Sequence, residues 1–176
     1  VSGAQATNQD HYGKTSLGGG AFGSLQWQIA PTTKPNDLLG VAMSRADLFG
    51  DDLTKFMDRA VRHMALMYGF GEGLPMVENR VELTARPGPG GTKLPELIHG
   101  FATPSKLLWE QAGKLGLKVM KAAGATEPWC GPFASAHLMG GTVMGSDART
   151  SVTDSYGRTH DIDNLFLAGP GLFPTG

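Results

Sequence analysis

An α+β fold with a mostly antiparallel sheet and flanking helices is predicted by three features of this chain of 176 residues. Residues 22–30 and 79–83 are candidate strands, since both are short runs that mix apolar and polar side chains. Residues 51–64 and 103–122 show the helical spacing of apolar side chains. These elements follow no regular strand–helix–strand order, which argues against a parallel doubly wound sheet.

The N-terminal part begins with a polar, glycine-rich stretch at residues 1–20, for which we expect a loop. In residues 22–30 the apolar side chains from Leu25 to Ile29 fall on alternate positions, as a half-buried strand requires. Pro31 lacks a backbone N–H to donate to a neighbouring strand, so we expect the strand to end there.

An amphipathic helix is predicted to begin at Asp51, because the apolar side chains after it recur at i, i+3, i+4 and i+7. Asp51 and Asp52 lie where the positive end of the helix dipole favours acids. After His63 the spacing changes to that of a short strand. We expect that strand to reach Tyr68 and to stop at Gly69.

The second candidate strand is followed by a proline- and glycine-rich loop at residues 86–95 and by a helix from Thr103 to Gly124. We expect the inner stripe of this helix to consist of Leu107, Leu108, Ala112, Leu115, Val119 and Ala122. Gly113 and Gly116 each cost about 1 kcal/mol relative to Ala by helix propensity. Packing therefore has to stabilise this helix.

Composition argues against several classes of function. The 15 basic and 16 acidic residues nearly cancel, so the chain has no electrostatic footprint for nucleic acid. Cys130 is the only cysteine, and the five histidines lack metal-ligand spacing, so we expect no disulfide and no metal site. Apolar runs such as residues 64–67 are far shorter than the roughly 20 residues that span a bilayer. We expect a soluble chain, in the cytoplasm or the periplasm.

Residues 137–176 carry the most informative pattern in the chain. His137 opens a glycine-rich turn that ends at Met144-Gly145, and a Ser-Val-x-Asp strand follows from Ser151. An Asn-Leu-hydrophobic strand then leads into a Phe-Pro-Thr turn that ends at Thr175. These elements, in this order, resemble the C-terminal flavin-closing segment of the glucose–methanol–choline (GMC) family of oxidoreductases.

The resemblance implies an organisation for the whole chain, and the Asn-Arg-Val-x-Leu strand after Pro75 extends it back to about Glu72. It implies a loop-rich segment at residues 1–21, a substrate-binding domain at 22–136 and the C-terminal segment of an FAD-binding domain at 137–176. No G-x-G-x-x-G turn opens a helix here, so we expect this chain to lack the main Rossmann-like part of that domain. We therefore expect the fragment of a larger flavoenzyme, which alone neither binds FAD tightly nor turns over.

FAD is the cofactor that the resemblance implies, and two glycine-rich turns are its expected contacts. Their cofactor-binding residues are expected to be Gly140, Gly141, Thr142, Gly169, Pro170, Gly171, Pro174 and Thr175. The first turn departs from the commonest family spelling, because a second glycine shifts Thr142 by one position. The second turn follows a predicted buried strand, Leu165–Ala168, and has Ala168-Gly169 where an Asp often precedes the glycine. Hydrogen bonds to the cofactor there would have to come from backbone N–H groups.

His137 stands at the position of the family's active-site histidine. Oxidation of an alcohol by hydride transfer leaves a hydroxyl proton, and a neutral imidazole suits its acceptance near pH 7. A buried structural histidine at a turn is the alternative. For His63, His99 and His160 we expect structural roles.

Substrate contacts are expected from Glu72 and Trp27, with Trp109 and Trp129 as further candidates. For each tryptophan, an ordinary place in the core is the alternative.

The leading hypothesis is an FAD-dependent oxidoreductase that acts on a CH–OH group of a sugar, polyol or related alcohol, with His137 as proton acceptor. The C-terminal motifs His-Asp-x-x-Asn-Leu-Phe and Phe-Pro-Thr-Gly are most similar to those of bacterial sugar dehydrogenases and pyranose-oxidising enzymes. A sterol or simple-alcohol oxidase of the same family is one alternative. A non-catalytic carbohydrate-binding or scaffolding remnant is another. The electron acceptor, whether oxygen, a quinone or a cytochrome, stays open.

Overall fold

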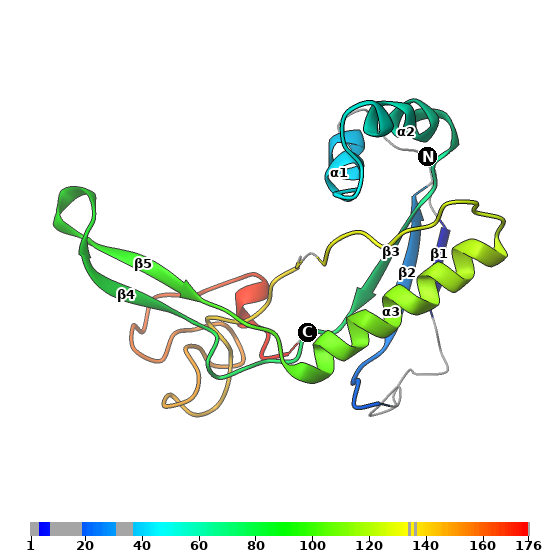
Figure 1. The fold of residues 1–176 in the computed structure, drawn as a ribbon. Coiled ribbons are helices and arrows are strands. Elements are labelled where there is room, and N and C mark those ends of the chain that lie inside the picture. The colour runs from blue at the N-terminus through cyan, green and yellow to red at the C-terminus, as the bar shows by residue number, and fades with distance from the viewer. Residues whose placement is uncertain (1–3, 8–18, 31–36, 134, 136, 176) are drawn as a thin grey trace. The chain divides into compact units, whose positions relative to one another are not determined.

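The computed structural model describes residues 4–7, 19–30, 37–133, 135 and 137–175. The chain divides into two compact units, which are residues 1–72 with 104–134 and residues 73–103 with 135–176. Short antiparallel sheets and helices make up the described part of the chain (Figure 1), so the predicted α+β class is confirmed for it. The functional division at residues 21 and 136 stays a prediction.

The sheet of the first unit has three antiparallel strands in the order β1–β2–β3. They are β1 (Ala4–Thr7), β2 (Leu25–Ala30) and β3 (Leu66–Gly71). The strands predicted around residues 22–30 and before Tyr68 are confirmed, but the expectation that residues 1–20 form only a loop was wrong at β1. Four residues are too few to establish a polarity period, and their pairing with β2 is a long-range contact that the local pattern does not encode.

Strand β3 continues through Gly69 to Gly71, although we expected glycine to stop it at Tyr68. Gly69 is the register partner of Trp27 on β2. A Cβ atom at Gly69 would lie 2.7 Å from the Trp27 ring. The missing side chain therefore makes room for the indole across the strand pair, which is a packing reason to have glycine in a strand.

Helix α3 (Thr103–Ala122) begins and ends near its predicted limits, and its predicted inner stripe is confirmed at Leu108 and Ala112 but not over its C-terminal half. Its buried residues are Ser105, Leu108, Ala112 and Gly116. Leu115 and Val119, expected on the inner stripe, are 36% and 51% exposed. The physical reason is close approach: a Cβ atom at Gly116 would lie 3.1 Å from the Trp27 ring. Glycine gives this helix a contact face that a search for large apolar side chains overlooks.

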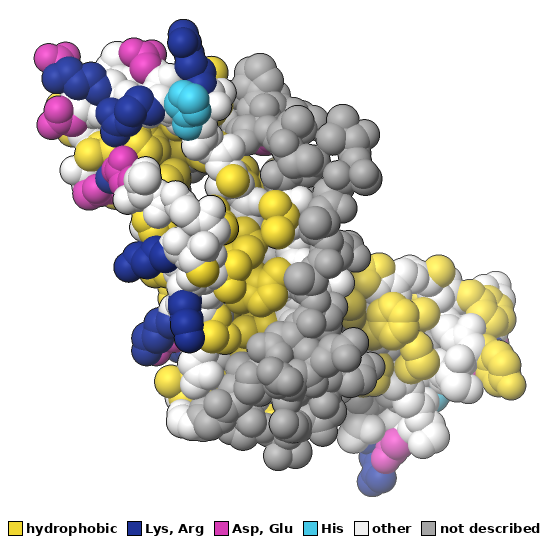
Figure 2. Space-filling view, turned by 90° about the vertical axis from the view of Figure 1, so that its right-hand side faces the viewer, with side chains coloured by type: hydrophobic (Ala, Val, Ile, Leu, Met, Phe, Trp, Pro, Cys, Tyr) yellow, Lys and Arg dark blue, Asp and Glu magenta, His cyan; other side chains and the backbone are white. Residues whose placement is uncertain are grey.

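The first unit has one core cluster between its sheet and α3, with Leu25 and Leu108. Helices α1 (Asp37–Met43) and α2 (Gly50–His63) form a second core cluster, which consists of Val41, Phe56 and Ala60. The predicted amphipathic helix is confirmed as α2. Figure 2 shows basic and acidic side chains side by side at the top of the molecule, where Figure 1 draws these helices. This mixed charge is what a solvated helix face requires.

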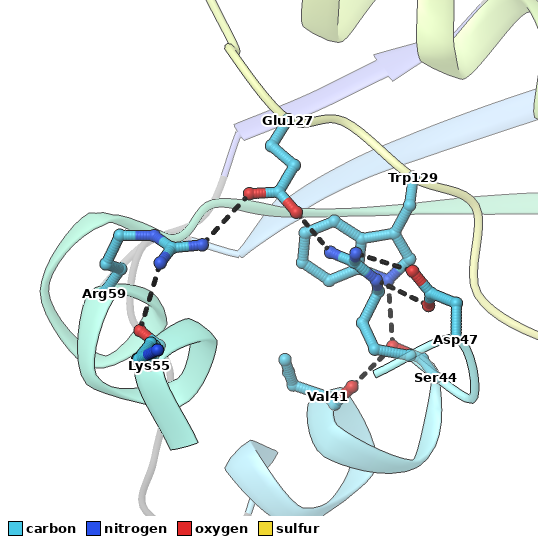
Figure 3. Close-up of polar contacts among 8 residues, drawn as sticks. Val41, Ser44, Asp47, Lys55, Arg59, Glu127 and Trp129 are labelled. Carbon is cyan, nitrogen blue, oxygen red and sulfur yellow. Dashed lines mark hydrogen bonds and ion pairs between the residues drawn. The ribbon is translucent and has the colours of Figure 1, made fainter. Parts of the chain in front are cut away.

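A buried guanidinium joins these helices to the segment after α3 (Figure 3). Arg45, 9% exposed, donates to Asp47 at 2.8 and 2.9 Å and to Glu127 at 2.8 Å. It lies 4.7 Å from the centroid of the Phe56 ring and 5.2 Å from that of Trp129. Its hydrogen bonds hold the pKa values of both carboxyl groups below their usual range.

The second unit begins with a two-stranded antiparallel hairpin of β4 (Arg80–Pro87) and β5 (Lys93–Ile98). The strand predicted at residues 79–83 is confirmed, and the predicted loop at 86–95 is shorter than expected. A 3-10 turn, η2 (Pro89–Gly91), closes the hairpin. At its base, the Asn79 amide accepts from the Gly100 N–H at 2.8 Å and donates to the Gly100 carbonyl at 3.1 Å.

The C-terminal segment of the second unit is held by isolated bridges and turns. Leu165–Ala168, predicted as a buried strand, pairs with residues 157–159 through the bridge between Arg158 and Phe166 and two backbone hydrogen bonds: the Thr159 N–H donates to the Leu165 carbonyl at 3.0 Å, and the Leu167 N–H donates to the Gly157 carbonyl at 2.8 Å. The prediction of burial was wrong, since Leu165 and Phe166 are 40% and 61% exposed. In the described part of the chain, this short pairing does not cover their side chains. The last element is the 3-10 turn η3 (Pro170–Leu172).

No helix in the described ranges combines the length and the apolar character that a membrane crossing requires. The residues described here also contain no group of three or more His, Cys, Asp or Glu side chains that could hold a metal ion.

Candidate functional site

Two segments that the sequence singled out separately lie side by side in the second unit. The Gly140 N–H donates to the Pro170 carbonyl at 3.1 Å, and the Thr142 N–H donates to the Gly171 carbonyl at 3.1 Å. A third bond follows from Met144 to the next residue of η3, at 2.9 Å. The structure therefore brings together four of the residues predicted to bind the cofactor, from turns that are far apart in the sequence.

Close packing explains one glycine of this pairing. A Cβ atom at Gly171 would lie 2.6 Å from the Thr142 hydroxyl oxygen, which is closer than real side chains approach. The backbone of η3 thus lies directly against the side chain of Thr142. Any side chain at residue 171 would push the two segments apart.

Other glycines leave backbone open. Gly141 has φ 95° and Gly169 has φ 114°, and a Cβ atom at either would have no atom within 4 Å. These are conformations that only glycine adopts without strain. Pro174 and Thr175, the last predicted contacts, are exposed after η3. The paired turns thus present bare peptide groups, which is what the close approach of a flat ring system requires.

His137 lies three residues before this pairing and has an unusual backbone. Its φ is 58°, and it is the only residue other than glycine with a positive φ in the part of the chain that the structure describes. Such a conformation costs on the order of 1–3 kcal/mol and persists where the surroundings enforce it. Its side chain is exposed, which disagrees with the alternative of a buried structural histidine. Its catalytic role stays a prediction.

A second histidine lies behind the turn. The Nε2 atom of His160 is 3.0 Å from the Ser151 hydroxyl and 3.2 Å from the Gly145 carbonyl, and the Ser151 hydroxyl donates to the Asp147 carbonyl at 2.7 Å. The exposed Arg149 is the first cause of a lowered pKa at Asp147, through a side-chain hydrogen bond. The expectation that His160 has a structural role agrees with this geometry. The spacing of Ser151 and His160 gave no hint that their side chains meet.

The predicted substrate residues Glu72 and Trp27 belong to the first unit. The Trp27 ring packs against the core formed by α3 and the sheet. Glu72 is exposed directly after β3, and a Cβ atom at Gly23 would lie 2.5 Å from its carboxylate. The expected cleft shared by Glu72 and His137 would join two units, and it stays a prediction, as do both substrate contacts.

The two further tryptophans, Trp129 and Trp109, differ in their surroundings. The Trp129 indole N–H donates to the Ser44 hydroxyl at 2.9 Å, and its ring packs edge-on against Phe56 at 5.4 Å between centroids. The Trp109 ring packs edge-on against Phe133 at the same distance of 5.4 Å. The contacts of Trp129, which packs against a core cluster, favour the ordinary core alternative for it. Trp109 and Phe133 are 37% and 44% exposed, so their pair lies at the surface and the core alternative does not fit Trp109.

Comparison with known proteins agrees with this geometry. Residues 116–176, which include the whole paired turn, match the family model of the GMC oxidoreductases. The fructose dehydrogenase large subunit of Gluconobacter japonicus is 32% identical over 139 residues, which are 77% of this chain and 26% of that protein. The chain belongs to the GMC oxidoreductases. The family predicted from the motif after His137 is thereby confirmed.

A second relative matches a shorter stretch of this GMC oxidoreductase chain. The gluconate 2-dehydrogenase flavoprotein of Pantoea cypripedii is 36% identical over 44 residues, which are 25% of this chain and 7% of the relative. The chain thus spans about a quarter of the length of the fructose dehydrogenase subunit and a small part of the gluconate dehydrogenase flavoprotein.

The residues present fit the flavin that the family implies. The glycine-rich turn at Gly140 and Gly141 is hydrogen-bonded to the turn at Gly169 and Gly171. The two turns are in tight contact, because a Cβ atom at Gly171 would lie only 2.6 Å from the Thr142 hydroxyl oxygen. Ala168 and Gly169 carry no polar side chain, so that hydrogen bonds from these two residues to a flavin would come from the backbone, which stays a prediction.

Proposed function

We propose that this chain forms part of an FAD-dependent oxidoreductase that oxidises a CH–OH group of a sugar, polyol or related alcohol. The observation that carries the proposal is the pairing of Gly140–Met144 with Pro170–Leu172 directly after the exposed and conformationally strained His137. The names of the two relatives, a fructose dehydrogenase and a gluconate dehydrogenase flavoprotein, support a sugar-type substrate.

The flavin-holding residues proposed for this chain are Gly140, Gly141, Thr142, Gly169, Pro170, Gly171, Pro174 and Thr175. Their contribution is mainly backbone, because the glycines in both turns let peptide groups reach the ring without an intervening Cβ atom. The bound flavin would supply the hydride acceptor of the reaction.

His137 is the proposed proton acceptor. As the carbon of the alcohol loses a hydride, its hydroxyl proton has to leave so that a carbonyl can form. A neutral imidazole within hydrogen-bond distance takes that proton and becomes imidazolium, so the charges balance. The exposed position of His137 allows this approach, and the strained backbone indicates that the turn fixes where the ring projects.

Glu72 and Trp27 are the proposed substrate contacts. The exposed Glu72 would accept hydrogen bonds from sugar hydroxyls, and the half-buried Trp27 would contribute apolar surface. The reduced cofactor would pass its electrons to oxygen, a quinone or a cytochrome, and the residues described do not favour one acceptor. A sterol or simple-alcohol oxidase would share the His137 chemistry and differ in the residues around the substrate.

The decisive experiment uses the flavoenzyme that contains this chain. Anaerobic mixing with fructose, gluconate, ethanol or cholesterol, followed by flavin absorbance, shows which donor reduces it. We expect His137→Ala to retain FAD and to lower the rate of flavin reduction by roughly 10²–10⁴-fold, the usual range for a positioned acid–base group.

His63→Ala is the matched control, because His63 is an exposed histidine at the end of α2. We expect it to leave the rate unchanged. A loss of less than about tenfold in His137→Ala would mean that His137 does not accept the proton. A protein without flavin absorbance would refute the cofactor assignment.

A further inference from the structure

The His160 side chain lies where three parts of the C-terminal segment meet. Its Nε2 atom is 3.2 Å from the Gly145 carbonyl oxygen and 3.0 Å from the Ser151 hydroxyl, while its backbone N–H donates to the Val152 carbonyl at 3.0 Å. The side chain and the backbone of one residue therefore hold the end of the glycine-rich turn and the segment after it.

The chemistry of the partners fixes the role of the ring nitrogen. The Gly145 carbonyl can only accept, so Nε2 must carry the hydrogen. The Ser151 hydroxyl donates its own hydrogen to the Asp147 carbonyl at 2.7 Å, which leaves its lone pairs for the imidazole. The bond to Gly145 is present whether or not Nδ1 also carries a proton, so the contact is suited to a permanent support.

Gly145 is the point at which this support acts on the turn. Its N–H donates to the Thr153 carbonyl at 2.8 Å, and the residue before it, Met144, donates to η3 at 2.9 Å. A Cβ atom at Gly145 would lie 2.9 Å from the Ser151 side chain, so the two segments are in direct contact. A shift of the Gly145 peptide would therefore move the turn that pairs with η3.

We propose that His160 is a positioning residue of the active site: its Nε2–H fixes the Gly145 carbonyl and thereby the turn that runs from His137 to Gly145. This inference rests on the proposed function, since its catalytic consequence is the placement of the His137 ring and of the bare backbone beside the flavin. His160 itself touches neither substrate nor cofactor in this assignment. A displaced catalytic group slows a reaction by up to about 10²-fold, even when the change lies away from the chemistry.

The test compares three substitutions at one position in the flavoenzyme. His160→Gln places an amide N–H near the position of Nε2, His160→Asn is too short to place it there, and His160→Phe keeps a ring but has no donor. His63→Gln and His63→Phe are matched controls, because His63 is exposed at the C-terminal end of helix α2. The readouts are backbone amide exchange in residues 140–153, the rate of flavin reduction by a sugar under anaerobic conditions, and the visible circular dichroism of the flavin.

We expect His160→Phe to speed amide exchange in residues 140–153 by about tenfold or more, because it leaves a carbonyl unpaired. We also expect it to slow flavin reduction by roughly 10–100-fold and to change the circular dichroism of the flavin. His160→Gln should restore both rates to within about threefold of the wild type, and the His63 variants should match the wild type.

The proposal is overturned if His160→Gln is as impaired as His160→Phe, or if His160→Phe lowers thermal stability alone while exchange, reduction and circular dichroism stay unchanged. Should His160→Phe fail to fold, the comparison of His160→Gln with His160→Asn decides, and equal rates in the two refute it. If no sugar, polyol or related alcohol reduces the wild-type flavin, the proposed function fails, whereas the exchange data still decide whether His160 fixes the turn.

Discussion

Gly171→Ala is expected to loosen the paired turns, because the new methyl group would lie 2.6 Å from the Thr142 hydroxyl oxygen. The segments are tied by hydrogen bonds on both sides of this contact, at Gly140 and at Met144. Overpacking of this kind costs typically about 1–3 kcal/mol. A cost of about 1 kcal/mol lowers the melting temperature of a domain of 150–250 residues by roughly 2–4 °C.

The second variant identifies the cause. Thr142→Ala removes the obstructing oxygen, and the nearest remaining atoms around the new methyl group would be at 3.6 and 3.9 Å, which is ordinary contact. We therefore expect Gly171→Ala to cost little in a Thr142→Ala background. Gly100→Ala is the control, since a Cβ atom there would have no atom within 4 Å. Thermal unfolding of the flavoenzyme, followed by flavin fluorescence, compares these four variants (Gly171→Ala, Thr142→Ala, the double variant and Gly100→Ala) with the wild type. An equal loss in both backgrounds would refute the contact as the cause.

Two further predictions concern the Arg45 cluster of the first unit. Arg45→Lys is expected to destabilise this unit by about 1–3 kcal/mol, because an ammonium group can form neither the paired hydrogen bonds to Asp47 nor the stacking on Phe56 and Trp129. Urea unfolding followed by tryptophan fluorescence measures this loss, and an unchanged unfolding midpoint would contradict the prediction. The lowered pKa values of Asp47 and Glu127 mean that their contribution to stability is present above the pKa values of the unfolded chain, about 4, and is lost as the pH falls through the folded values. Stability measured from pH 6 to pH 3 should therefore fall less steeply in Arg45→Met than in the wild type, and parallel curves would argue against the pairing.

The periodic spacing of apolar side chains predicted the helices and strands in which that spacing is clear. Helix α2 and strands β2 and β4 lie close to the expected ranges, since each has a period that its own side chains establish. Strand β1 was missed, and Leu165–Ala168 was assigned to a buried strand, for a common reason. Whether a short extended run is paired and covered depends on residues elsewhere in the chain, which its own letters do not specify.

The candidate site divides in the same way. The motif after His137 singled out the two turns that the structure pairs, because glycine spacing and the order of the turns are local features of one stretch of sequence. Their contacts with a cofactor stay a prediction. The bonds from Gly140 and Thr142 to η3 and the contact of His160 with Gly145 are long-range or side-chain features, and only coordinates show them. A polar residue that meets a carbonyl through its side chain leaves no periodic signal.

Glycine in helix α3 gives a final test of packing against propensity. Gly113 and Gly116 both cost about 1 kcal/mol relative to Ala by propensity, so Ala at either position should stabilise the helix equally if propensity alone decided. A Cβ atom at Gly116 would lie 3.1 Å from two atoms of the Trp27 ring, whereas one at Gly113 would lie 3.3 Å from the sulfur of Cys130 alone, an exposed residue. The Trp27 ring is held between the sheet and the helix and has little room to move, while the cysteine side chain can rotate away. We therefore expect Gly113→Ala to raise the unfolding midpoint of the flavoenzyme and Gly116→Ala to leave it unchanged or lower it. Equal stabilisation by both substitutions would show that α3 does not pack on Trp27 through Gly116.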